Sequence, residues 1–310
     1  MRRTDFKCGW LQVVRALRNA GRWTTGSRSR RSGVAVRLLA CALLGLFALA
    51  GPAVQAADDT AKSADGPLLI TLGSYGVYGP RFEGSKRHDI SPWPIINWRN
   101  ANDKEWLDLP TDGIDYALIE TNSFRFGPVG FWRWQRDTNT LAPRGFSRVG
   151  KGKSSIDLSI EAGLFAEYWP VEWLRTRVEV REALLGASGI IANISSDLVW
   201  KPNASWTFAA GPRASFADSE FMDDYYGVNA AQSATSGLPQ FRTAAGIRSF
   251  GAGAFAKYKI SEAWTTAGFF NYEHLTGSAG DSPVIITRGS REQYMLGLGL
   301  SYTFKAPWEK

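Results

Sequence analysis

The chain has 310 residues, a formal net charge of +7, 44% hydrophobic and 13% aromatic residues, and only two cysteines and two histidines. Residues 1–56 hold ten of its 36 basic side chains, one of its 29 acidic side chains and both cysteines, which leaves 26 basic and 28 acidic side chains beyond them. Residues 57–310 therefore lack the positive excess typical of nucleic-acid binding, and they offer no disulfide, thiol nucleophile or thiolate metal site.

The N-terminal segment has the three parts of a secretory signal peptide. An arginine-rich stretch precedes a charge-free apolar run, which ends in the small-residue pattern V-Q-A at 54–56. A transmembrane anchor is the alternative, but Gly51-Pro52 near the end of the run and the lack of a basic flank after it favour a signal peptide. We expect residues 1–56 to be removed and residues 57–67 to form an N-terminal periplasmic segment.

Segments with a period of two recur through the rest of the chain, and 291–304 is the clearest. Large apolar residues occupy one parity, and small or polar residues occupy the other. Aromatic residues at both ends of an apolar face are typical of barrel strands that face lipid. A soluble β-sandwich could produce one such strand, so the choice between a sandwich and a membrane barrel depends on the other segments. The apolar parity comprises Tyr294, Leu296, Leu298, Leu300, Tyr302 and Phe304.

Connection lengths favour a membrane barrel. Bacterial outer-membrane barrels have an even number of strands, short periplasmic turns and longer outer loops. We predict an all-β fold, an antiparallel transmembrane β-barrel over residues 68–304, with a short tail at 305–310. The barrel has 12 strands if 105–109 and 114–120 are both strands, and ten if 90–120 is irregular. Short turns are expected near 100–103, 121–123, 169–172, 201–205 and 260–263.

Three regions depart from the regular pattern. Pro92 and Pro94 interrupt the segment 90–99, which predicts an edge-like or irregular strand. The strand expected at 241–260 loses its polar parity near Gly251–Gly253, which predicts a bulge. The insertion 218–239 is expected to be a loop with one helical turn around 221–226.

Charged residues share the parity opposite to the apolar face. Because charges are costly in lipid, this parity must line an interior or face water. We favour a cross-strand ion-pair ladder that fills the lumen over an ion-conducting path, since a lumen of this size can be occluded by long side chains. The candidates are Arg125, Arg133, Asp157, Glu161, Glu167, Arg175, Arg177, Glu179, Arg181 and Arg213.

The sequence offers little for catalysis. A Ser-His or His-Asp site would need one of the two histidines beside a nucleophile or a carboxylate. His274 with Asp281 or Ser278 is conceivable at the outer rim, but an interface or loop histidine is favoured for both His274 and His88. No spacing typical of metal ligands is present. We expect a protein that is not an enzyme and uses no cofactor or metal.

Several motifs together resemble the MltA-interacting protein (MipA)/OmpV family over about 68–304. The resemblance implies a Gram-negative outer-membrane β-barrel. The founding member is a scaffold between a lytic murein transglycosylase and a bifunctional penicillin-binding synthase, and OmpV-type members are surface antigens. The motifs include G-P-R-F-E-G-S-K at 79–86, G-F-W-R-W-Q-R-D at 130–137, F-A-E-Y-W-P at 165–170, Y-Y-G-V-N-A-A-Q-S-A-T-S-G-L-P at 225–239, R-G-S-R at 288–291 and G-L-G-L-S-Y-T-F at 297–304.

The resemblance gives an expected function. We expect a scaffold in the outer membrane, in contact with lipid, with a murein transglycosylase and a penicillin-binding synthase as partners and no nucleic acid. The alternatives are a small-solute channel and a surface-exposed adhesion or antigen protein. One departure is that Lys305–Lys310 follow Phe304, whereas such barrels usually end on an aromatic residue that the insertion machinery reads.

Overall fold

A computed structural model describes residues 66–133 and 159–306 of the chain. The predicted signal peptide (1–56) lies outside the described residues, as do nearly all of the predicted N-terminal segment (57–67), the predicted loop at 136–155 and most of the tail (305–310). Candidate Asp157 lies outside them too. No helix in the described ranges is long and apolar enough to cross a membrane.

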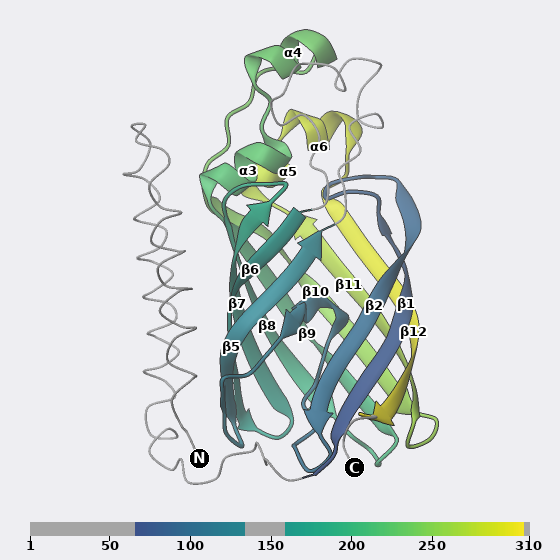
Figure 1. Ribbon diagram of the computed structural model, residues 1–310. Coiled ribbons are helices and arrows are strands. Elements are labelled where there is room, and N and C mark those ends of the chain that lie inside the picture. Colours follow the sequence, from purple (N-terminus) through teal and green to yellow (C-terminus); the bar gives the residue numbers. More distant parts are fainter. Residues whose placement is uncertain (1–65, 134–158, 307–310) are drawn as a thin grey trace. The chain divides into compact units, whose positions relative to one another are not determined.

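The described strands form one antiparallel sheet of twelve strands, which curls into a nearly closed barrel (Figure 1). Neighbours in sequence pair from β5 to β12, and β12 pairs with β1, which confirms the predicted barrel. Two strands, β3 (Ile114–Asp115) and β4 (Ile119–Glu120), are short and both pair with β5. The ten long strands are β1 (Leu68–Pro80), β2 (His88–Asn100), β5 (Phe124–Arg133), β6 (Ser159–Val171), β7 (Leu174–Leu185), β8 (Ile190–Trp200), β9 (Trp206–Ala217), β10 (Gly246–Lys259), β11 (Trp264–Leu275) and β12 (Glu292–Lys305).

The two faces of the strands follow the predicted parity. On β12, Leu298 is 70% exposed, whereas Gly297 and Gly299 on the opposite face are buried. Exposed tryptophans, Trp173 and Trp200, lie at strand ends, as aromatic residues do at a membrane interface. The outer surface is therefore an apolar band, and the small and polar residues face the lumen.

The connections are mostly short at one end of the barrel and mostly long at the other. Residues 172–173, 201–205 and 260–263 join strands at the end that also holds Leu68 and Lys305. We call this the turn end and the opposite end the loop end. This asymmetry is the one that outer-membrane barrels show.

Four short helices lie at the loop end: α3 (Ser219–Tyr226), α4 (Ala230–Ser236), α5 (Gly277–Gly280) and α6 (Pro283–Arg288) (Figure 1). Helix α3 includes the predicted helical turn. Its N-cap is Asp218, whose Oδ1 accepts a hydrogen bond of 2.8 Å from the Phe221 N–H. The helices and their connections form a cap over this end of the barrel.

Two predictions for β10 were wrong. The strand begins at Gly246 and not at 241, because Phe241 pairs instead with Val228 in the cap. The register shift lies between Ile247 and Ser249, not at Gly251–Gly253. A bulge adds one residue to a strand and re-aims side chains. Here it buries both Arg248 and Ser249, although consecutive strand residues normally face opposite sides.

Residues 101–123, between β2 and β5, form a segment that we call the plug. Its first part enters the lumen, where Leu107 and Leu109 are buried, and its second part, 114–120, pairs with β5 in the wall and exposes Leu118 and Ile119. Its predicted strand at 105–109 was wrong, because residues 104–109 form no ladder. The chain instead turns at η2 (Pro110–Asp112) and Gly113, and returns along β5 as β3 and β4. Gly113 has φ 74°, and a Cβ there would lie 2.5 Å from the Gly130 carbonyl oxygen, so the turn requires glycine.

The wall is not closed by backbone hydrogen bonds beside β2. This strand pairs with β1 along its length, and no other described strand pairs with its second edge. Pro92 and Pro94 have no N–H to donate, and proline in a sheet is confined to such edges. The prediction of an edge-like strand is confirmed. We call the line between β2 and the plug strands β3 and β4 the seam.

Replacing Gly299 with alanine is expected to destabilise the barrel. A Cβ at Gly299 would lie 2.4 Å from the Tyr75 ring, which packs edge-on against Phe269 at 5.5 Å between ring centroids. Gly299→Ala should lower the free energy of unfolding by about 1–3 kcal/mol, as overpacking does. Urea unfolding in detergent micelles, followed by tryptophan fluorescence, measures the change.

Gly76→Ala is the matched control, because a Cβ there meets only the Leu298 carbonyl oxygen at 4.0 Å. It should be neutral or slightly stabilising, since alanine loses less backbone entropy than glycine. Equal destabilisation by both variants would contradict this account of β12.

Candidate functional site

The most distinctive internal feature is a group of buried ion pairs on the hairpin β6–β7. Arg175, Arg177, Glu179 and Arg181 alternate along β7 with residues that face lipid, so all four point into the lumen. Each is at most 4% exposed. The register places Arg177 opposite Glu167 on β6, which brings unlike charges together.

Glu167 is the centre of this group. Its Oε2 accepts hydrogen bonds from Arg175 Nη2 at 2.8 Å and Arg177 Nη1 at 3.0 Å. Its Oε1 accepts one from Trp169 Nε1 at 2.8 Å and lies 3.7 Å from Arg125 Nη1. One fully buried carboxylate therefore partners three arginines.

The arginines of β7 also hold the plug. Arg175 Nη2 donates to Asp112 Oδ2 at 2.5 Å, and Arg177 Nη2 lies 2.8 Å from Asp115 Oδ2. Arg177 further donates to the Asp112 carbonyl oxygen at 3.4 Å. Arg125 on β5 reaches the second oxygen of Asp115 at 3.1 Å. The turn of the plug is thus tied to the barrel wall by charge-assisted hydrogen bonds.

An apolar contact fixes the other part of the plug. Leu107 and Leu109 are buried and belong to a hydrophobic cluster inside the barrel. They pack there with Trp169, Phe255 and Phe269 from three different strands. The lumen at this level is therefore filled by a packed core, as in a soluble domain.

The ion pairs continue toward the loop end. Arg181 Nε donates to Glu161 at 3.1 Å, and Glu161 also accepts from Arg133 Nε at 2.9 Å. Arg133 Nη1 then donates to Glu83, in the connection after β1, at 2.9 Å. Glu179 pairs with both Arg177 and Arg181 and closes the series.

Glu83 links the ladder to the cap. It accepts hydrogen bonds from Arg248 on β10 and from the Tyr226 hydroxyl on α3. Burial alone would raise the pKa of Glu83, but the positive charges of Arg248 and Arg133 lower it below its usual value. The carboxyl group is therefore ionised at neutral pH and holds four segments together.

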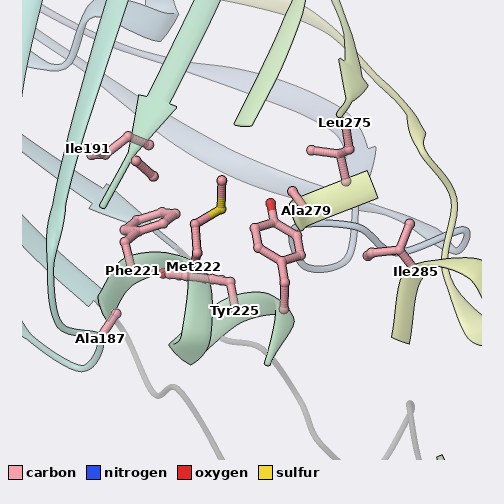
Figure 2. Packing of buried hydrophobic residues seen from close by; sticks show 10 residues of the cluster. Ala187, Ile191, Phe221, Met222, Tyr225, Leu275, Ala279 and Ile285 are labelled. Atoms are coloured by element: carbon pink, nitrogen blue, oxygen red, sulfur yellow. The ribbon is translucent and has the colours of Figure 1, made fainter. Parts of the chain in front are cut away.

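The cap has its own hydrophobic core at the loop end. Figure 2 shows Phe221, Met222 and Tyr225 of α3 beside Ile191 at the start of β8 and Leu275 at the end of β11. All five are buried. This cluster joins the helices of the cap to the strand ends beneath them.

Two cavities lie on either side of the plug. The upper cavity, about 120 Å³, is lined by Asp112, Arg177 and Glu179 and, nearer the cap, by Arg248 and Glu273. The lower cavity, about 580 Å³, is lined by the plug and by β1, β2, β10, β11 and β12, and reaches the turn end at Lys259 and Glu262. The turn of the plug and the β7 arginines lie between the two.

Nine of the ten candidate residues lie in this system, and the tenth, Asp157, is outside the described residues. Arg213, which has not yet been described, pairs with Asp197 at 2.6 Å. Asp197 in turn contacts Arg175 at 3.3 Å. The sequence reasoning missed Asp112, Asp115, Glu83, Asp197 and Arg248. Asp197 could have been predicted, because it has the inward parity of β8. Asp112 and Asp115 lie in the plug, Glu83 in a loop and Arg248 at a bulge, where the alternation of a regular strand does not apply.

The conceivable histidine site does not form in the described structure. His274 Nδ1 lies 2.7 Å from Glu292, whereas Ser278 accepts a hydrogen bond from the Ala244 N–H and Asp281 pairs with Arg291. His88 stacks with Tyr78 and Tyr294. Among the residues that the structure describes, no group of three His, Cys, Asp or Glu side chains could hold a metal ion.

Replacing Glu167 with glutamine is expected to destabilise the barrel strongly. The change leaves Arg175 and Arg177 buried without a carboxylate that they now share. Breaking a buried ion pair by removing one partner costs about 3–5 kcal/mol. Urea unfolding of the refolded barrel measures the loss, and the double variant Glu167→Gln/Arg177→Met should recover part of it.

The control is Arg81→Gln, which breaks the exposed Arg81–Asp89 pair. Exposed pairs contribute about 0–1 kcal/mol, so this variant should unfold almost as the unmodified barrel does. A Glu167 variant that is no less stable than the Arg81 variant would show that the buried ion pairs do not stabilise the barrel.

Comparison with known proteins gives a family match over most of the chain. The model described as MltA-interacting protein MipA matches residues 72–304. No curated protein matches the chain.

Among solved structures, the chain is similar to NanC porin (9% identity, 76% of this chain and 98% of that chain, TM-score 0.34). It is also similar to the loop L8 deletion mutant of OmpT, an outer membrane protein of Vibrio cholerae (10% identity, 76% and 98%, TM-score 0.33), and to OprG of Pseudomonas aeruginosa (10% identity, 80% and 100%, TM-score 0.25). The apolar outer band, the short turns at one end and the family match agree. The chain is an outer-membrane β-barrel protein and belongs to the MltA-interacting protein MipA family.

Proposed function

We propose that this barrel is an envelope scaffold that binds a lytic murein transglycosylase of the MltA class at its turn end. The observation that carries the proposal is the match to the MltA-interacting protein family, which spans nearly the whole barrel. By the resemblance of its sequence motifs, a penicillin-binding synthase is the second partner. The barrel then anchors murein enzymes at the inner surface of the outer membrane.

The occupied lumen supports a binding role. The plug fills the middle of the barrel with Leu107 and Leu109, and its turn is tied to Arg175 and Arg177. The cap adds a second packed layer at the loop end. Both features weigh against the alternative of a small-solute channel, which the charged lumen had suggested. A surface-antigen role involves only the loop end and does not compete with binding at the turn end.

The turn end is the surface that a periplasmic enzyme can reach. Short connections face the periplasm in outer-membrane barrels. Here they carry the exposed charged residues Glu172, Lys201 and Glu262, one in each of three turns. Charges around an interface set the rate and specificity of encounter, so these three positions are suitable probes of docking.

Reversing these charges is expected to weaken binding of the enzyme. The triple variant Glu172→Lys/Lys201→Glu/Glu262→Lys should bind a purified MltA-type transglycosylase about tenfold or more weakly, because losing one charged contact costs about 1–3 kcal/mol. Biolayer interferometry with the barrel held in nanodiscs gives the dissociation constants.

A cap variant provides the control. Arg242 is exposed on the opposite end of the barrel, so Arg242→Glu should leave the affinity unchanged. Failure of the unmodified barrel to bind any lytic transglycosylase or penicillin-binding synthase would refute the scaffold proposal. Equal loss in the cap variant and the turn variant would refute docking at the turn end.

A further inference from the structure

The lower cavity has an opening that an ordinary barrel lumen lacks. Its lining includes Asn97 and Arg99, on the inward parity of β2, and also Ile96 and Trp98, on the outward parity. Ile96 is 44% exposed and Trp98 is 43% exposed. The strands β10, β11 and β12, which are paired on both edges, contribute only alternate residues to this lining, whereas β2 contributes consecutive residues of both faces beside its unpaired edge. The lower cavity therefore passes around the edge of β2.

The seam is the place where this happens. Across it lie Ile114 and Tyr116 of the plug, which line the same cavity. Backbone pairing does not close the gap, since no described strand pairs with the second edge of β2 and Pro92 and Pro94 remove two donors from that strand. A smaller cavity of about 60 Å³, lined by Pro94 and Leu109 among others, continues along the seam.

The part of the lower cavity nearest the turn end is charged. Lys257 Nζ and Lys259 Nζ donate to the two oxygens of Glu105, at 2.5 and 2.6 Å, so one carboxylate neutralises two ammonium groups. Arg99 donates to the backbone carbonyl oxygens of residues 100, 101 and 103, and no described carboxylate pairs with it. Among the described residues these three cations have between them one carboxylate, Glu105, as an ion-pair partner, although the whole cavity lining holds five basic and six acidic side chains.

A carboxylate lies in the same cavity. Asp108 is exposed to the lumen and accepts a hydrogen bond of 2.8 Å from Asn97 Nδ2. It takes part in no ion pair within the described residues. The cavity thus offers cations for an anionic group, Asp108 among its carboxylates for a cationic group, and an apolar opening at the seam.

We propose that the lower cavity binds the head group of one zwitterionic phospholipid, whose acyl chains leave through the seam into the membrane. The phosphate contacts Lys257, Lys259 and Arg99, the amine lies near Asp108, and the chains pass Ile96 and Trp98. The lipid comes from the inner leaflet, because the cavity reaches the turn end, which faces the periplasm. A volume of about 580 Å³ lies within the range of small-ligand pockets, about 300–1,000 Å³.

A photo-crosslinker inside the barrel tests entry of the lipid. Thr265 on β11 lines the lower cavity, and Thr207 on β9 is a buried residue paired with Lys257 that does not. The full barrel, carrying benzoylphenylalanine at position 265, is irradiated in vesicles of phosphatidylethanolamine and phosphatidylglycerol. We expect the mass of one phospholipid to be added at position 265 and none at 207.

Position 298, which faces lipid on β12, is the positive control for the chemistry. An adduct at 298 with none at 265 would overturn the proposal, and so would equal adducts at 265 and 207. The second result would mean that lipid reaches the lumen without using the seam cavity.

Charge variants test the head-group contacts. In Lys257→Met/Lys259→Met, retention of phosphatidylethanolamine in native mass spectra should fall about tenfold or more, the expected effect of losing charged hydrogen bonds. Lys201→Met removes an exposed lysine from a turn outside the cavity and should leave retention unchanged. Heat-modifiable gel migration checks that each variant is folded.

The Lys257→Met/Lys259→Met/Glu105→Gln variant covers the case in which the unpaired Glu105 perturbs folding, because it removes all three charges together. It should lose the lipid as the double variant does. Glycerophosphoethanolamine, the soluble form of the same head group, distinguishes a membrane lipid from a soluble periplasmic ligand. If it displaces the lipid and gives the crosslink pattern by itself, the ligand is a periplasmic solute and the membrane source is wrong. Retention that is equal in all variants would mean annular lipid only.

Discussion

The contact of the β7 arginines with the plug is the constraint on which the interior depends. Arg175 and Arg177 share Glu167 of the wall, and each also binds one carboxylate of the plug, Asp112 or Asp115. Each has a second wall partner, Asp197 for Arg175 and Glu179 for Arg177. Buried charges are costly unless every one is paired, so the plug and the wall require each other. With the plug removed, two guanidinium groups would lose part of their partners. With the two arginines removed, Asp112 would lose its guanidinium partner and Asp115 would keep only Arg125.

The same logic extends to both ends of the barrel. Toward the loop end, Glu83 shares Arg133 with Glu161 and takes Arg248 from the bulge in β10, so the outer connections are tied to the wall. Toward the turn end, the plug leaves the lower cavity open. Among the described strands, only β1 pairs with β2, so the second edge of β2 has no strand beside it in the ladder. The barrel is thus closed by side chains where it lacks a backbone ladder, and its open spaces face the periplasm and the inner leaflet.

How much of this was predictable depends on whether a residue belongs to a long strand. Period-two patterns predicted the barrel, the outward face of β12 and the inward charges of β7, because a strand fixes the side of each residue. The plug was not predictable in this way. Leu107 and Leu109 alternate as a strand would, but Pro110 and Gly113 turn the segment into the lumen, and its apolar residues pack there without a ladder. Arg248 was missed because the bulge reverses the parity at that point. Asp112 and Asp115 gain their role from contacts with arginines of β7 and, for Asp115, of β5, which no local pattern encodes.

The scaffold proposal and the lipid site both require an occupied lumen, through which solutes do not pass. Single-channel recording in planar lipid bilayers tests this requirement most directly. We expect no conductance steps for the unmodified barrel, and steady open steps for a variant in which residues 104–118 are replaced by a flexible glycine and serine linker. Steady conductance of the unmodified barrel, at the level of the linker variant, would contradict an occupied lumen.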